Sequence, residues 1–271
     1  MAQLSLSKAW DETRAIFARD GGLLIAVALA MLVLPETVVG LMTPGGSSMT
    51  VVGRCVWLVG ALIGIVGQIA LVRLALGPST TVGHAIGHGA RRFLPTLGSL
   101  LILFACLAII VMPLMIVLML AGVVTVPVAG QQPPPSFTFV ALFLALASLA
   151  FSVKFMMVVP VAAAESAGPL DIIKRSWRMT SGNYWRLLGF LLLLLVAAIF
   201  LLAAAQFVGG IVAQLIAGKI APFSLGALIL ALLLALASAS ATTLFAVMLA
   251  RIYLQLTGAA AAQASVPSSG T

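Results

Sequence analysis

Six long runs of apolar residues constrain this chain more than any other feature of its sequence. They cover residues 22–42, 52–76, 97–124, 137–161, 187–209 and 223–253. A helix needs about 20 apolar residues to cross the hydrocarbon core of a bilayer, and every run reaches that length. Only 7% of the residues are charged, which excludes an ordinary soluble domain. The sequence therefore predicts an all-α integral membrane protein, with residues 1–257 as one domain of six transmembrane helices.

The basic residues are distributed unequally between the two sides of this predicted domain. One side holds both termini and the second and fourth connections, and it receives Lys8, Arg14, Arg19, Arg73, Arg91, Arg92, Lys154, Lys174, Arg175, Arg178, Arg186 and Arg251. Arg54 and Lys219 fall on the other side. The positive-inside rule then places both termini in the cytoplasm of a bacterial cell, with the chain in its plasma (inner) membrane. With this distribution, the net charge of +8 favours anionic lipid headgroups and not nucleic acid as partners.

Residues 169–181 form the densest patch of charge and aromatic side chains in the sequence. Its charged residues recur at the spacing i, i+3, i+4 and i+7, which is one face of a helix: Asp171, Lys174, Arg175 and Arg178. Leu170, Ile173, Trp177 and Thr180 fall on an opposing stripe, which Ile172 and Met179 widen. Gly182 is expected in the left-handed position that ends a helix, and Asn183 is expected to cap the next one. The pattern predicts an amphipathic helix on the membrane surface, followed by a sharp turn into the fifth span.

Two earlier segments, residues 5–19 and 80–93, show a similar pattern before the first and third spans. Aligning Gly22, Gly98 and Gly189 also aligns Phe17, Phe93 and Tyr184. We therefore predict three transmembrane hairpins, each preceded by a cytoplasmic amphipathic surface helix, as in a threefold repeat. Convergent membrane-entry chemistry is the alternative explanation. Residues 258–271 are rich in Ala, Ser and Gly and are predicted to form a disordered tail.

Glu36 and Arg54 are the charged residues within or near the outer halves of the spans. At 1.5 Å per residue, Glu36 lies about 9 Å inward from the connecting loop and Arg54 about 5 Å. Because an isolated charge is costly at such depth, we predict an ion pair between them. The alternative is a snorkelling Arg54 and a wet helix end at Pro35. On the opposite side, we expect Glu165 to pair with Arg175 or Arg178, and the ammonium group of Lys154 to reach the interface.

Other candidate sites have structural interpretations. His84 and His88 have the i, i+4 spacing of two metal ligands, but the sequence offers no third ligand nearby, so we expect surface histidines and no metal. The Gly60-x-x-x-Gly64 pattern with Gly67 is typical of close helix packing. The sequence shows no nucleophile–base pair, carboxylate dyad or phosphate-binding loop. We therefore expect no cofactor and no enzymatic activity.

The passage from Glu165 to Trp185 resembles a motif in membrane domains related to those attached to some bacterial glycerophosphoryl diester phosphodiesterases. The match lies in Arg175-Ser176-Trp177-Arg178-Met179-Thr180-Ser181-Gly182-Asn183-Tyr184-Trp185-Arg186. The six-span layout extends the resemblance over nearly the whole chain, although only the motif is specific. The phosphodiesterase barrel and its metal ligands have no counterpart in this sequence. The resemblance implies a shared fold with stand-alone multi-pass relatives and no phosphodiesterase activity.

These observations lead to three alternative functions. The favoured one is a non-enzymatic membrane protein that binds anionic lipid, a partner protein or a second copy of itself through its basic and aromatic surface helices. Its candidate site comprises Glu165, Asp171, Lys174, Arg175, Ser176, Trp177, Arg178, Gly182, Asn183 and Trp185. Arg175 and Arg178 are the expected headgroup contacts, and Trp177 and Trp185 the interfacial anchors. The alternatives are a small transporter of an amphiphile and, less favoured, an enzyme acting on lipid; the motif could also serve only to lock its helix to the bundle.

Overall fold

The computed structural model describes residues 5–44, 50–77, 81–124, 134–218 and 220–264, and every regular element in these ranges is helical. The α-helices are α1 (Leu6–Ala28), α2 (Leu34–Met42), α3 (Val51–Leu76), α4 (Val82–Leu120), α5 (Pro135–Ser152), α6 (Val158–Ala164), α7 (Pro169–Ser181), α8 (Tyr184–Ala217) and α9 (Leu225–Ala264). A π-helical turn at Leu29–Val33 joins α1 to α2, and a 3₁₀ turn at Val153–Phe155 follows α5.

Six of the helical segments are long and apolar enough to cross a membrane. They are Leu6–Met42, Val51–Leu76, Val82–Leu120, Pro135–Ala164, Tyr184–Ala217 and Leu225–Gly258. Each contains or closely overlaps one of the predicted spans. The all-α class is therefore confirmed, and the described residues contain six helical segments that could span a membrane.

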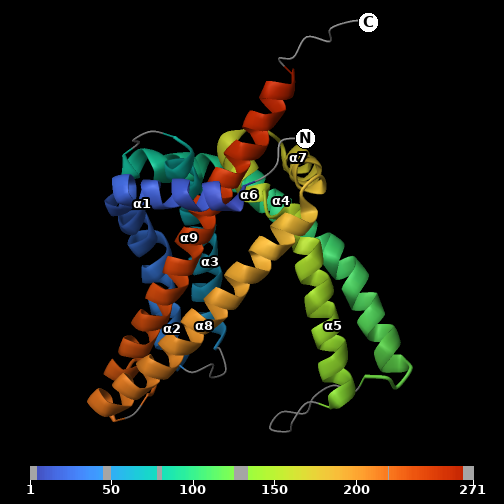
Figure 1. The fold of residues 1–271 in the computed structure, drawn as a ribbon. Helices are drawn as coiled ribbons and strands as arrows, with labels where there is room; N and C mark the ends of the chain where they lie inside the picture. The colour runs from blue at the N-terminus through green and yellow to red at the C-terminus, as the bar shows by residue number, and fades with distance from the viewer. Residues whose placement is uncertain (1–4, 45–49, 78–80, 125–133, 219, 265–271) are drawn as a thin grey trace, which may run out of the picture.

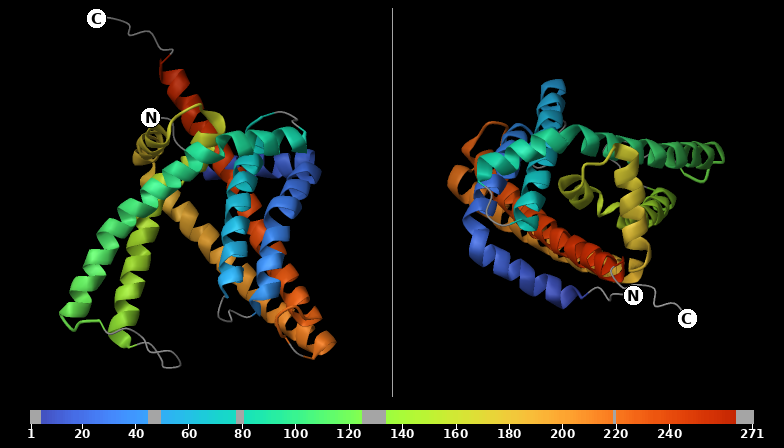
Figure 2. Two further views of the ribbon diagram at one scale, coloured as in Figure 1. Left: turned by 180° about the vertical axis from the view of Figure 1, so that it is seen from behind. Right: turned by 90° about the horizontal axis from the view of Figure 1, so that it is seen from above.

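α9 runs through the centre of the molecule and packs against α1, α2, α3 and α8 (Figure 1). The start of α1, the end of α9, α6 and α7 lie together at one end, which we call the α7 end. From this end, α4 and α5 diverge from the other long helices (Figure 2). No described residue of α5 is buried, so this part of the chain has its apolar surface available to lipid.

The first two predicted surface helices are not separate elements. α1 continues without interruption past Gly22, and α4 continues past Pro95 and Gly98. A proline inside a helix removes one backbone hydrogen bond and allows a bend without ending the helix, and α4 contains Pro95 and Pro113. α1 and α4 therefore have no helix end at residues 19 and 93, and the bounds of these two surface helices stay a prediction. The third surface helix is separate and has the predicted bounds of 169–181.

The first part of the predicted C-terminal tail is helical. α9 continues to Ala264, so residues 258–264 are helical, and residues 265–271 lie outside the described part of the chain. Alanine is the residue with the highest helix propensity, and the alanine-rich sequence after Gly258 extends a helix that is already formed.

Glycines allow α3 to approach its neighbours closely, as predicted. A Cβ atom at Gly67 would lie 2.7 Å from the Cβ atom of Met31, and one at Gly60 would lie 3.3 Å from the Cβ atom of Pro35. These contacts pack α3 against the π turn and the start of α2. Such backbone proximity is how small residues stabilise helix pairs in membranes.

Gly89 on α4 supports the most sensitive of these close contacts. A Cβ atom there would lie 2.7 Å from the carbonyl oxygen of Val66, a backbone atom of α3. We expect Gly89→Ala to lower the free energy of unfolding by about 1–2 kcal/mol, because the two helices must move apart. Gly87→Ala on the same helix is the matched control, since no atom lies within 4 Å of its added methyl group. Reversible unfolding in bicelles measures both; equal stabilities would contradict the contact.

Candidate functional site

α7 begins and ends as its sequence indicates, and its fully buried residues lie along one line of the helix. Pro169 lies at its first position, Asp171 in its first turn and Arg178 in its last, which matches the helix dipole. The fully buried residues are Ile172, Ser176 and Thr180, each 0% exposed and spaced by four. Ile172 and Thr180 belong to the predicted stripe, whereas Leu170 and Trp177 of the same stripe are 58% and 45% exposed. The inward face of α7 is therefore partly polar.

The polar residues of α7 bind a backbone group released by a break in the fourth span. Pro160 has no N–H to donate to the carbonyl group of Met156, and it lies in the first turn of α6, just after the interruption of the helix. α5 ends at Ser152, and the carbonyl oxygen of Lys154 accepts hydrogen bonds from Ser176 Oγ at 2.9 Å and from Thr180 Oγ1 at 3.3 Å. The prediction of one unbroken helix over 137–161 was wrong, and its interruption is where α7 attaches.

The side chain of Lys154 lies between two aromatic rings. Its Nζ atom is 5.0 Å from the ring centroid of Trp177 and 5.1 Å from that of Tyr184. It donates a hydrogen bond to Ser181 Oγ at 3.2 Å. The ring of Phe155 packs 5.6 Å from that of Trp177. Cation–π attraction therefore adds to the hydrogen bonds that hold α7 to the turn after α5.

Glu165 connects α7 to the central helix α9. Arg175 Nε donates to Glu165 Oε1 at 3.3 Å, which confirms the predicted ion pair. The hydroxyl group of Tyr253 donates to the same oxygen at 2.8 Å. The neighbouring Ser166 accepts a hydrogen bond from Arg92 of α4 at 2.6 Å. The hydrogen bonds from Tyr253 to Glu165 and from Arg92 to Ser166 were not predicted, because these donors lie far from their acceptors in the sequence.

α4 holds the segment around α7 through two further hydrogen bonds. Ser99 Oγ donates to the carbonyl oxygen of Pro169 at 3.0 Å. His88 Nε2 donates to the carbonyl oxygen of Ala163 at 2.9 Å. Among the described residues, no group of three His, Cys, Asp or Glu side chains could hold a metal ion. We call the attachment formed by Lys154, Glu165, Arg175, Ser176, Thr180 and Tyr253 the α7 clasp.

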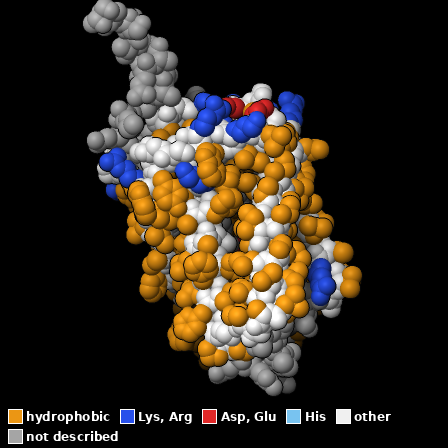
Figure 3. All heavy atoms as spheres, turned by 90° about the vertical axis from the view of Figure 1, so that its right-hand side faces the viewer, with side chains coloured by type: hydrophobic (Ala, Val, Ile, Leu, Met, Phe, Trp, Pro, Cys, Tyr) orange, Lys and Arg blue, Asp and Glu red, His pale blue; other side chains and the backbone are white. Residues whose placement is uncertain are grey.

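The outward side of α7 is basic and aromatic. Lys174 and Arg178 are exposed, and neither forms an ion pair or hydrogen bond with another described residue. Trp177 is 45% exposed, and Trp185 at the start of α8 is 80% exposed. On the face of the molecule drawn in Figure 3, most charged side chains lie at the α7 end, above a broad apolar band. We call Lys174, Trp177, Arg178 and Trp185 the basic–aromatic face.

The turn between α7 and α8 differs from its prediction. Gly182 has φ −80°, which is right-handed, so the left-handed cap is wrong. Asn183 precedes the first residue of α8 as predicted, but its side chain accepts no capping hydrogen bond. Backbone bonds make the turn, since Asn183 N donates to the carbonyl oxygen of Thr180 at 3.2 Å and Leu187 N donates to that of Asn183 at 3.0 Å.

The predicted ion pair of Glu36 and Arg54 is not formed. Glu36 Oε1 accepts a hydrogen bond from Ser238 Oγ of α9 at 3.1 Å, and no salt bridge between described residues joins it to Arg54. The π turn explains the difference. Leu34 N bonds to the carbonyl oxygen of Leu29, five residues back, so the helical register shifts just before Glu36.

Together these features define, over the described residues, an all-helical protein with six helical segments that could cross a membrane and with α7 clasped at one end. The chain belongs to a family described as a domain of unknown function (DUF7847), whose model matches residues 4–256. No curated protein and no solved structure matches it.

Proposed function

We propose that this protein is a non-enzymatic, multi-pass protein of the bacterial inner membrane that binds anionic lipid headgroups through its basic–aromatic face. The main supporting observation is that Lys174 and Arg178 are exposed and have no acidic partner among the described residues. The exposed Trp177 lies on the same helix, and the exposed Trp185 lies at the start of the next one. Tryptophan is enriched at the level of lipid headgroups. Each Lys or Arg near an anionic surface contributes about 1 kcal/mol of attraction.

The headgroup contacts in this proposal differ from those expected from sequence alone. Arg175 is engaged by Glu165 and belongs to the α7 clasp. The proposed headgroup contacts are therefore Lys174 and Arg178, which are four residues apart and hence lie on one side of α7. The clasp supports binding indirectly, because a rigid helix presents both cations without a further loss of conformational entropy.

The proposed orientation places the α7 end in the cytoplasm, together with both termini. Its support is the positive-inside rule and the common location of α7, the start of α1 and the end of α9 (Figure 1). The order of the connections fits three hairpins, and the threefold repeat and the relation to phosphodiesterase membrane domains remain part of the proposal.

Native mass spectrometry with added phosphatidylglycerol tests this function. The wild-type chain is expected to retain the lipid, and Lys174→Ala/Arg178→Ala is expected to bind it about thirtyfold more weakly. Lys8→Ala/Arg14→Ala is the matched control, because it removes two exposed cations from α1 and produces the same change in net charge. Equal retention by the two double variants would contradict the proposal and leave the motif with an architectural role.

A further inference from the structure

Two cavities between the helices meet inside the described part of the chain. The first has a volume of about 510 Å³ and lies between α3, α4, α5, α8 and α9, beside the turn after α5. The second, about 830 Å³, lies between the π turn and α2 on one side and α3, α8 and α9 on the others. Gln68 and Thr242 line both cavities, so the two cavities adjoin at these residues.

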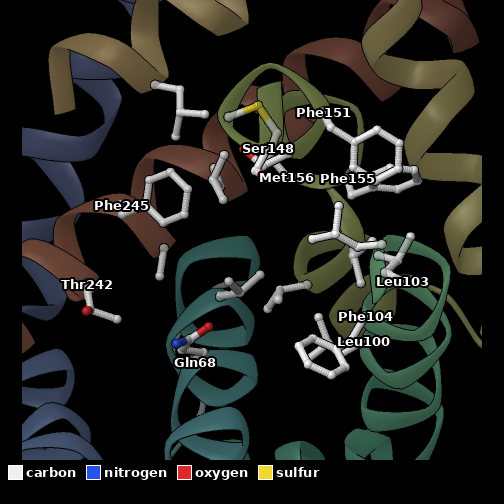
Figure 4. A pocket seen from close by; sticks show the side chains of 18 residues that line it. Gln68, Leu100, Leu103, Phe104, Ser148, Phe151, Phe155, Met156, Thr242 and Phe245 are labelled. Carbon is white, nitrogen blue, oxygen red and sulfur yellow. The ribbon is translucent and has the colours of Figure 1, made fainter. Parts of the chain in front are cut away.

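The two cavities have different chemical character. Figure 4 shows the first, where aromatic and aliphatic side chains from α4, α5 and α9 surround the space, among them Leu103, Phe104, Phe151 and Phe245. The second is lined in part by Glu36, Gln206, Ser238 and Trp57. Among the described lining residues of both cavities, Glu36 is the one with a charge.

The carboxylate of Glu36 has capacity for a further partner. One oxygen accepts the hydrogen bond of Ser238, and the other has no hydrogen-bond partner among the described residues. Arg54 does not neutralise it. Ionisable residues inside a membrane domain are costly and characteristically belong to ligand or ion sites. The missing counter-charge is therefore best supplied by a ligand.

We propose that the two adjoining cavities bind an amphiphilic organic cation, with its ammonium group at Glu36 and its hydrocarbon chain passing Gln68 and Thr242 into the first cavity. Charge complementarity selects the ammonium group, because the lining offers one carboxylate and no cation. Trp57 adds an aromatic face of the kind that attracts ammonium groups. The same carboxylate repels anionic lipid. The site is therefore separate from the basic–aromatic face and takes the opposite charge.

Equilibrium binding of radiolabelled dodecyltrimethylammonium to the full chain in zwitterionic nanodiscs tests this site, with empty nanodiscs subtracted. Saturable binding is expected, and Glu36→Gln is expected to weaken it about thirtyfold, because it removes the counter-charge and keeps the side-chain shape. Asp11→Asn, which removes an exposed carboxylate from α1, is expected to bind as the wild type does. Absence of saturable binding, or unchanged binding by Glu36→Gln, would overturn the proposal.

A second pair of variants tests the location of the cation site by placing a bulky side chain inside or outside the second cavity. Ala203 of α8 lines the second cavity, whereas the adjacent Ala204 does not line either one. Ala203→Phe is expected to abolish binding, and Ala204→Phe to retain it. Lys174→Ala/Arg178→Ala is expected to bind the cation normally, which separates this site from the proposed lipid face. If Ala203→Phe fails to fold, the comparison of Glu36→Gln with Asp11→Asn decides.

Discussion

Replacing Ser176 with Ala and Thr180 with Val in one molecule is expected to lower the free energy of unfolding by about 2–3 kcal/mol. Both side chains are fully buried; Ser176 Oγ donates to the carbonyl oxygen of Lys154 at 2.9 Å, and Thr180 Oγ1 shares its hydrogen between that oxygen at 3.3 Å and the carbonyl oxygen of Ser176 at 3.0 Å. Without them, that oxygen loses both side-chain donors, and an unsatisfied buried polar group costs about 1–3 kcal/mol by itself. Reversible unfolding in bicelles measures the change.

The matched control removes the same atoms elsewhere. Ser152→Ala/Thr138→Val deletes two hydroxyl groups from α5 that are exposed and bond only to nearby carbonyl oxygens of their own chain segment. Its expected change is below about 0.5 kcal/mol. If the two double variants have the same stability, the Lys154 carbonyl does not hold α7 in place.

Substitution of Glu165 by Ala is expected to produce the second large effect, a loss of about 2 kcal/mol. The change removes the acceptor for Tyr253 and the ion-pair partner of Arg175 at once. Hydrogen bonds to a charged group contribute about 1.5–3 kcal/mol each when buried. The expected loss of stability is close to the lower end of this range because the Glu165 side chain is 32% exposed and solvent partly screens its ion pair.

A double-mutant cycle separates the contribution of Tyr253 from the rest. Tyr253→Phe removes one hydroxyl group and keeps the ring, and it is expected to cost about 1 kcal/mol. In the Glu165→Ala background, the same substitution is expected to cost much less, because the bond is already lost. Full additivity of the two single changes would mean that Glu165 and Tyr253 do not interact.

The sequence predicts the third surface helix well because its signals are local. Pro169 at the first position and the spacing of its charged residues determine both its bounds and its amphipathic character. The predicted stripe includes Thr180 but not Ser176, although both are fully buried. Ser176 faces inward because it bonds to a backbone carbonyl oxygen, and a backbone acceptor leaves no trace in the side-chain pattern. Pro160 was the one sequence signal that the helix of the fourth span is interrupted. This interruption leaves the carbonyl oxygen of Lys154 accessible to the side chains of α7.

The interior polar site could not be predicted in the same way. Gln68, Gln206 and Ser238 belong to three different helices, and only the tertiary fold brings them to the cavity that Glu36 lines. The expected partner of Glu36 was wrong because one additional residue in the π turn redirects its side chain from Arg54 to Ser238. Helical spacing in a sequence assumes regular α-helix and does not reveal such a shift.

Fluorescence quenching by brominated lipid tests the central proposal, that anionic lipids gather at the basic–aromatic face. Trp10→Phe/Trp57→Phe leaves Trp177 and Trp185 as the fluorophores of a chain with 4 tryptophans. The protein is placed in equal mixtures of phosphatidylglycerol and phosphatidylcholine, with bromine on the acyl chains of one lipid or the other. We predict stronger quenching when phosphatidylglycerol carries the bromine, and loss of that difference in Lys174→Ala/Arg178→Ala. Equal quenching by the two lipids in the parent protein would contradict the account.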